Sequence, residues 1–154
     1  MARTQQLCTF LLDGLLFGVD VMNVQEVIRL QDMTPVPLTS AIVRGLINLR
    51  GQIVTAIDMR PRLSLPDRAK DAEPMNVVVR TTDGVVSLLV DEIGDVLEVS
   101  DDAWERSPET MTAQLRDVVS GVYKLPGRLL LSLDVERVAT AFSAARGGRA
   151  EAFA

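Results

Sequence analysis

The sequence predicts a mainly β fold, built as two small barrels side by side within a single domain that spans residues 1–154. Three observations predict it: an internal repeat, a series of tight-turn signals between apolar runs, and an aliphatic composition. Of the 154 residues, 47% are hydrophobic but only 4% are aromatic, so the core must consist mainly of Leu, Val and Ile. Short strands joined by tight turns favour barrels, because closing a sheet removes its exposed edges.

The internal repeat relates residues 45–58 to residues 121–134 without a gap. Both segments read as an apolar strand, a tight turn and a second apolar strand. The clearest matches are four pairs: Gly45 and Gly121, Leu49 and Leu125, Gly51 and Gly127, Asp58 and Asp134. An ungapped match over a whole strand-turn-strand unit indicates the duplication of one module. The copies differ at the turn, where Arg50 corresponds to Pro126.

Four hairpins are predicted along the chain. Asp13-Gly14 and Asp83-Gly84 each lie between two apolar runs, and Asp-Gly readily takes the positive φ values of a type I′ turn. The repeated segments turn at Arg50-Gly51 and Pro126-Gly127. The expected strand pairs are 6–12 with 15–20, 44–49 with 52–58, 75–81 with 85–90, and 118–125 with 128–133.

A short helix is predicted over residues 21–29, directly after the first hairpin. Asp20 precedes it and is a residue type that caps helix N-termini. In such a helix, Val24 and Val27 would lie on one side, with Glu26 on the exposed side.

The predicted domain divides into consecutive segments. The polar stretch between Pro66 and Pro74 reads as a loop, and Asp134 precedes a last apolar pattern at helical spacing. The final residues show no buried pattern. The expected segments are a first barrel module at 6–63, a connecting loop at 64–74, a second barrel module at 75–134, a C-terminal helix at 135–143 and a disordered tail at 144–154.

The composition argues against several classes of function. The chain has no histidine, which removes the commonest general base and metal ligand and excludes catalysis by Ser-His or Cys-His pairs. Its single cysteine, Cys8, lies in an alternating apolar run and is expected to be a core residue. The net charge of −5 argues against nucleic-acid binding. No apolar run is long enough to span a membrane, so we expect a cytoplasmic protein. We also expect it to bind no cofactor and no metal.

Two other functions stay open from the residues alone. One is a small enzyme that uses carboxylates, because residues 91–102 include six acidic residues. Their spacing does not fit a calcium loop, and a solvated acidic face is the favoured interpretation. The other is a barrel that binds a small ligand, although barrels of this size leave little internal space.

Glu26 and Arg50 stand out as charged residues beside aliphatic ones. Arg50 lies in a hairpin turn, where a long cation extends into solvent, and Glu26 has Val24 and Val27 close by in the sequence. A mixed patch of aliphatic side chains with one acid and one arginine is typical of a protein-binding surface. Two ordinary solvated charges are the alternative.

A set of ordered motifs runs through nearly the whole chain, from about Leu7 to Phe142. They are Phe17-Gly18-Val19-Asp20, Val24-Gln25-Glu26-Val27-Ile28, Val43-Arg44-Gly45-Leu46-Ile47-Asn48-Leu49-Arg50-Gly51, Ile57-Asp58-Met59-Arg60, Val90-Asp91-Glu92-Ile93-Gly94-Asp95-Val96-Leu97 and Gly127-Arg128-Leu129-Leu130-Leu131-Ser132-Leu133-Asp134. In these motifs the chain resembles the CheW-type chemotaxis coupling proteins. The Asn-Leu-Arg-Gly hairpin with its flanks is quite specific, and the ordered set is more so.

The resemblance implies two packed, five-stranded SH3-like β-barrels, in agreement with the repeat. It also implies a non-catalytic adaptor that couples the cytoplasmic tip of methyl-accepting chemoreceptors to the regulatory domain of a CheA-type histidine kinase, recruited to receptor arrays at the membrane. In such proteins the Glu of Val-Gln-Glu and the Arg of Asn-Leu-Arg-Gly matter for these contacts. Carried over to this sequence, the expected binding residues are Val24, Glu26, Val27, Gly45, Asn48, Arg50 and Gly51.

Overall fold

A computed structural model of the chain describes residues 3–29, 33–35, 42–69 and 71–139. Strands dominate it, so the predicted mainly β fold is confirmed. The strands are β1 Thr4–Leu12, β2 Leu15–Asp20, β3 Val24–Arg29, β4 Val43–Leu49, β5 Gln52–Asp58, β6 Met75–Thr81, β7 Gly84–Val90, β8 Glu92–Ser100, β9 Trp104–Glu105, β10 Val119–Leu125 and β11 Arg128–Leu133. The 3₁₀ turns η1 Val21–Asn23 and η2 Asp101–Ala103 and the short helices α1 Met59–Arg62 and α2 Ala113–Arg116 connect them.

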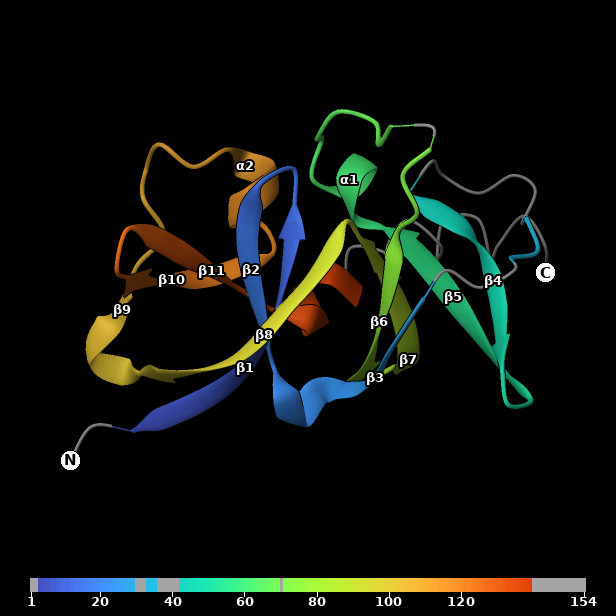
Figure 1. Cartoon of the computed structure of the whole chain (residues 1–154), viewed down its shortest axis with the longest axis horizontal. Coiled ribbons are helices and arrows are strands. Elements are labelled where there is room, and N and C mark those ends of the chain that lie inside the picture. Colours follow the sequence, from blue (N-terminus) through green and yellow to red (C-terminus); the bar gives the residue numbers. More distant parts are fainter. Residues whose placement is uncertain (1–2, 30–32, 36–41, 70, 140–154) are drawn as a thin grey trace.

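The strands form two sheets that lie side by side (Figure 1), and each sheet takes strands from both halves of the chain. One sheet has six strands in the order β8-β1-β2-β11-β10-β9, and the other has five in the order β3-β6-β7-β5-β4. The expected five strands per barrel are thus exceeded in one sheet, because of the two-residue strand β9. The consecutive modules expected at 6–63 and 75–134 do not coincide with the sheets.

The chain changes sheet twice, and this explains the interleaving. After β2 it passes through η1 into β3, which pairs with β6, and after β7 it passes through Asp91 into β8, which pairs with β1. A single residue cannot reverse the chain, so β8 continues across to the other sheet (yellow in Figure 1). The β4–β5 hairpin then completes the sheet that contains β6 and β7, with β5 parallel to β7. The β10–β11 hairpin completes the sheet that contains β1 and β2, with β11 parallel to β2.

Both sheets close on themselves in the same way. In the five-stranded sheet, Thr34 follows edge strand β3 and pairs with Leu46 on the opposite edge strand β4 through two hydrogen bonds of 2.8 Å. In the six-stranded sheet, edge strand β8 continues through η2 into β9, which pairs with β10. The matched glycines Gly45 and Gly121, each beside a β-bulge, leave room for these closing segments. A Cβ atom there would lie 2.7 Å from the Thr34 carbonyl oxygen or 2.5 Å from the Trp104 ring.

All four predicted hairpins are present, with a difference in one turn. Asp13-Gly14 has the positive φ values that a type I′ turn requires. In the third hairpin Thr81 pairs with Gly84, so the turn residues are Thr82-Asp83, and the predicted turn at Asp83-Gly84 is wrong by one position. The Thr81 hydroxyl fixes this register, because it donates to the Gly84 carbonyl oxygen at 2.8 Å.

The predicted helix over residues 21–29 is wrong. Asp20 does cap the chain, since its carboxylate accepts a hydrogen bond from the Met22 N–H at 2.9 Å, but only the turn η1 follows. Residues Val24–Arg29 form β3 instead and pair along β6. Their β-branched side chains fit a pleated strand, and the edge of β6 has backbone groups that need partners.

The predicted C-terminal helix over residues 135–143 is described only as far as residue 139. Residues 135–139 are helical, and the Asp134 carboxylate caps them by accepting hydrogen bonds from the N–H groups of Glu136 and Arg137 at 3.0 and 3.2 Å. The rest of this helix and the expected disordered tail at 144–154 lie outside the described residues.

One apolar cluster spans both sheets. It includes Phe10 and Phe17 of the six-stranded sheet, whose rings stack with centroids 5.7 Å apart, and Ile57 and Leu88 of the five-stranded sheet. Each sheet also has a smaller cluster, with Leu7, Leu16, Val99, Tyr123 and Leu130 in one and Ile47, Leu49, Val54 and Val78 in the other. Because successive side chains of a strand alternate between its faces, the same strands serve both kinds of cluster. The shared cluster holds the two sheets together.

A largely buried ion cluster lies around Asp91, where the chain crosses between the sheets. Arg60 of α1 donates two hydrogen bonds to its carboxylate, at 2.9 and 2.6 Å, and Arg68 donates another at 3.0 Å. The backbone N–H of Asp13, in the β1–β2 turn, adds one at 2.8 Å. Arg68 also pairs with Asp58 at 3.3 Å. The cluster therefore ties both sheets to the connecting loop.

The ion cluster sets the protonation of Asp91. Burial by itself raises the pKa of this carboxyl group, but hydrogen bonds from Arg60, the Asp13 N–H and Arg68 together lower it from an ordinary 3.8 to about 2. A carboxyl group with a lowered pKa stabilises the folded state fully above its unfolded pKa. The stabilisation by Asp91 is therefore lost as the pH falls from about 4 towards 2.

We predict that Asp91→Asn lowers the free energy of unfolding by about 3 kcal/mol at neutral pH, because Arg60 and Arg68 lose the charge that compensates their burial. The difference from the unaltered protein should shrink as the pH falls from about 4 to about 2, since Asp91 itself then becomes neutral. Urea unfolding followed by circular dichroism at several pH values measures this. A difference that is independent of pH over this range would contradict the assignment.

Candidate partner-binding site

Glu26 and Arg50 form a direct ion pair, although they belong to opposite ends of the five-stranded sheet. Glu26 is on β3, and Arg50 is in the turn between β4 and β5. Closure of the sheet brings them together, so that Nη1 of Arg50 donates to Oε2 of Glu26 at 2.6 Å. The Arg50 side chain is 78% exposed and that of Glu26 only 17%. The guanidinium group of Arg50 therefore faces solvent.

The conformation of the β4–β5 turn positions Arg50. Arg50 and Gly51 have φ values of 54° and 87°, both in the left-handed region that a type I′ turn requires. The side-chain oxygen of Asn48 accepts a hydrogen bond from the Gly51 N–H at 2.9 Å and so stabilises the turn. Pro126, the matched residue in the β10–β11 hairpin, cannot adopt a positive φ. The second copy of the hairpin therefore has a different turn, and neither of its two turn residues, Pro126 and Gly127, is a cation.

The other predicted residues divide between core and surface. Val24 packs against the cluster shared by both sheets, and Gly45 is buried against Thr34, so these two residues shape the sheet. Val27 is half-buried on β3. The structure thus brings together Glu26 and Arg50, with Asn48 and Gly51 in the same hairpin as Arg50.

Two exposed apolar residues on these elements are missing from the sequence-based prediction. Ile53 is 61% exposed and lies directly opposite Asn48 in the β4–β5 ladder, and Met22 is 78% exposed in η1, just before β3. A two-residue turn at Arg50-Gly51 sets this register, and residues directly opposite share a face, so the polar Asn48 is a signal that Ile53 is exposed. Met22 has no comparable signal. We call Glu26, Asn48, Arg50 and Ile53 the hairpin patch.

The second carboxylate oxygen of Glu26 supports a role beyond stability. Within the described residues, this atom, Oε1, is buried and accepts no hydrogen bond. An unsatisfied buried acceptor costs about 1–3 kcal/mol, and more when it is charged. Stability alone therefore does not account for a glutamate at this position.

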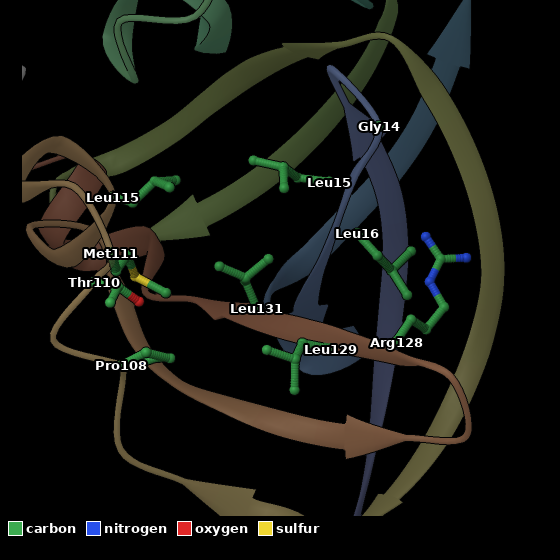
Figure 2. Close-up of a pocket in the computed structure, with 10 residues that line it drawn as sticks. All are labelled: Gly14, Leu15, Leu16, Pro108, Thr110, Met111, Leu115, Arg128, Leu129 and Leu131. Carbon is green, nitrogen blue, oxygen red and sulfur yellow. The ribbon is translucent and has the colours of Figure 1, made fainter.

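A separate apolar groove lies on the six-stranded sheet, between β2, β11 and residues 108–115 (Figure 2). Its volume is about 400 Å³, and its apolar side chains include Leu15, Leu16, Met111, Leu115, Leu129 and Leu131. Thr110 and Arg128 supply the polar side chains of the lining. Small-ligand sites usually have several convergent polar groups, so the groove gives no support to a ligand-binding barrel.

The groups suited to catalysis are dispersed or buried. Among the described residues, no group of three or more acidic or cysteine side chains is placed to hold a metal ion. Apart from Asp91, the acidic residues of 91–102 are exposed along β8 and η2, as expected of a solvated face. Cys8 is buried, and burial raises the pKa of its thiol, which disfavours the reactive thiolate. This arrangement does not favour an enzyme that uses carboxylates.

Residues 6–142 match the family model of the CheW-like domain. The chain belongs to this family. It is 29% identical to the chemotaxis protein CheW of Treponema pallidum, over 86% of this chain and 81% of that protein. It is 31% identical to the chemotaxis protein CheW of Rhizobium meliloti, over 79% of each. The crystal structure of the scaffolding protein TtCheW from Thermoanaerobacter tengcongensis is similar with a TM-score of 0.78 and 25% identity, over 87% of this chain and 91% of that one.

The similarity to the TtCheW structure, together with the two sheets of six and five strands, confirms a mainly β fold of the CheW type. Family membership supports an adaptor role in chemotaxis. No helix among the described residues combines the length and the apolar character needed to cross a bilayer.

We predict that Gly45→Ala and Gly51→Ala differ in their effect on folding. Gly45→Ala should cost about 2 kcal/mol, because its Cβ would collide with the Thr34 carbonyl, which pairing with Leu46 holds in place. Gly51→Ala should cost about 1 kcal/mol, because among the described residues no atom beyond the two chain neighbours lies within 4 Å of the new Cβ, and the positive φ is what opposes the change. Urea unfolding measures both changes. Equal losses would show that Gly45 does not serve closure of the sheet.

Proposed function

We propose that this protein is a non-catalytic adaptor, which joins the cytoplasmic tip of methyl-accepting chemoreceptors to the regulatory domain of a CheA-type histidine kinase. It would act in the cytoplasm, at receptor arrays on the membrane. The observation that carries the proposal is the Glu26–Arg50 pair, whose guanidinium is exposed at the surface and whose buried glutamate oxygen has no sufficient explanation in stability. Family membership supports the same role, and the hairpin patch is the proposed contact surface.

The energetics of the pair favour a role in binding. An exposed ion pair typically contributes no more than about 1 kcal/mol to folding, and Arg50 is mostly exposed. In an interface the same guanidinium is desolvated, and loss of one member of a buried charge pair then costs about 2–5 kcal/mol. Arginine is also enriched among the residues that dominate interface energies. The patch should therefore matter much more for partner binding than for the fold.

The rest of the hairpin patch has the composition of an interface. Ile53 supplies an exposed aliphatic surface, and Asn48 lies opposite it in the ladder. An apolar centre beside polar groups is the usual anatomy of a protein–protein contact. An adaptor of this kind forms and breaks no bonds. It changes the relative stability of different receptor–kinase arrangements, and many weak contacts in an array act together through avidity.

We predict that Arg50→Glu and Glu26→Lys each weaken kinase and receptor binding at least tenfold, a loss of about 1.4 kcal/mol or more. The melting temperature of Arg50→Glu should stay within a few degrees of the unaltered protein, because the Arg50 side chain is mostly exposed. Glu26→Lys places a cation at a largely buried position, so its effect on binding is compared at a temperature at which the variant is folded. Pull-down and receptor-coupled kinase activity measure the loss. Lys124→Glu is the control, since it reverses the cation of another exposed pair, formed with Glu105 at 2.9 Å. Normal coupling by both folded variants would refute the proposed site.

The double variant Glu26→Lys with Arg50→Glu separates two roles of the pair. It restores an ion pair within the protein but places a carboxylate where partners meet a guanidinium. We predict normal stability with binding as weak as in the single variants, as calorimetry and pull-down can measure. Restored binding would mean that the pair only shapes the hairpin.

A further inference from the structure

The 64–74 connecting loop is the one covalent link between two halves that complete each other's sheets. The first half supplies β1 to β5, and the second supplies β6 to β11. Four strand pairs join the halves: β1 with β8, β2 with β11, β3 with β6, and β5 with β7. We propose that two copies of this chain associate by exchanging halves through this loop, and that a clamp formed by Arg60 and Arg68 favours the closed single chain.

Exchange of halves would rebuild nearly every contact of the single chain. The strand pairs and the apolar cluster depend on which residues meet and not on which copy carries them. The same holds for the Arg60–Asp91 pair, which joins α1 of the first half to the β7–β8 junction of the second. Only the path of the connecting loop has to change, so the conformation of the loop determines whether the chain forms a closed monomer or an exchanged dimer.

The connecting loop contains features that favour each state. Arg68 in the loop pairs with Asp58 of the first half and with Asp91 of the second, at 3.3 and 3.0 Å, and Arg60 donates to the Pro66 carbonyl oxygen at 2.7 Å. These contacts stabilise the loop conformation found in the closed monomer. Ser64 has a φ of 57°, a left-handed conformation that is unfavourable for serine and is relieved when the loop extends. The described loop residues form no strand or helix that an extended path would disrupt.

Closure within one chain has the advantage of a high effective concentration, in the millimolar range for a short flexible link. The clamp adds to that advantage. A loop that cannot bring the two halves of one chain together removes it, and pairing with a second copy is then the remaining way to bury the shared cluster. The resulting particle carries two hairpin patches.

The main test replaces residues 66–73 in the full chain by a spacer of about 20 residues. A helical spacer of alanine, glutamate and lysine holds its ends about 30 Å apart, whereas a glycine–serine spacer of the same length is flexible. We expect the helical spacer to give a particle of twice the single-chain mass and the flexible spacer to give a monomer, both with the cooperative urea unfolding of a folded protein. A folded monomer with the helical spacer, an unfolded chain with it alone, or dimers with both spacers would overturn the proposal.

A protease site within the helical spacer distinguishes exchange from ordinary surface contact. Cutting an exchanged dimer should return particles of single-chain mass, because the spacers are all that joins its two units. A dimer that survives cutting would be held by a surface instead and would refute the exchange.

A second test keeps the natural loop length. Arg68→Ala, refolded from urea at high protein concentration, should give a dimer fraction several times that of the unaltered chain, since the clamp is weakened. Lys124→Ala, which removes an exposed pair elsewhere, is the matched control and should leave the fraction unchanged. No increase with Arg68→Ala, or an equal increase with both variants, would show that the clamp does not govern the exchange.

Discussion

Mutual completion of the two sheets is the constraint on which the rest of the structure depends. Neither half of the chain forms a closed sheet by itself, because β2 pairs on one side with β11 of the second half and β7 pairs on one side with β5 of the first half. The apolar cluster around Phe10 and Leu88 is shared in the same way. The ion cluster around Asp91 stands where the chain crosses between the sheets and adds a tie that the apolar contacts lack, since its hydrogen bonds fix direction as well as distance.

The hairpin patch is a product of this closure. Glu26 and Arg50 are on a strand and a turn at the two ends of the five-stranded sheet. The pairing of Thr34 with Leu46 helps to bring those ends together. Gly45 permits that pairing because it has no side chain. Gly45, which is itself buried, therefore helps to form the surface that we propose as the binding site. Fold and site cannot be altered independently at this place.

Local chemistry made the hairpins and caps predictable. The Asp13-Gly14 and Arg50-Gly51 turns, the apolar strands around them and the capping roles of Asp20 and Asp134 all follow from preferences of a few adjacent residues. The segment after Asp20 was not predictable in this way, because its apolar spacing fits a helix and the competing edge of β6 is distant in the sequence. The interleaving has a similar cause: duplicated hairpins fit their own half or the other half equally well by pattern. The short junction at Asp91 settles the choice, and its effect is visible only in three dimensions. Ile53 is a milder case, since its exposure follows once the register with Asn48 is known.

Duplication usually gives a molecule two similar ends, but the tips of the matched hairpins here are chemically unlike. One carries a guanidinium in a left-handed turn, and the other carries Pro126, whose ring forbids that turn. No single substitution of the proline by a cation reproduces the first tip without also remaking the backbone beneath it. The tips of the β4–β5 and β10–β11 hairpins are therefore two different surfaces, and a linear assembly of such molecules would have two unlike ends. Heterologous, head-to-tail contacts are the kind of association compatible with that arrangement.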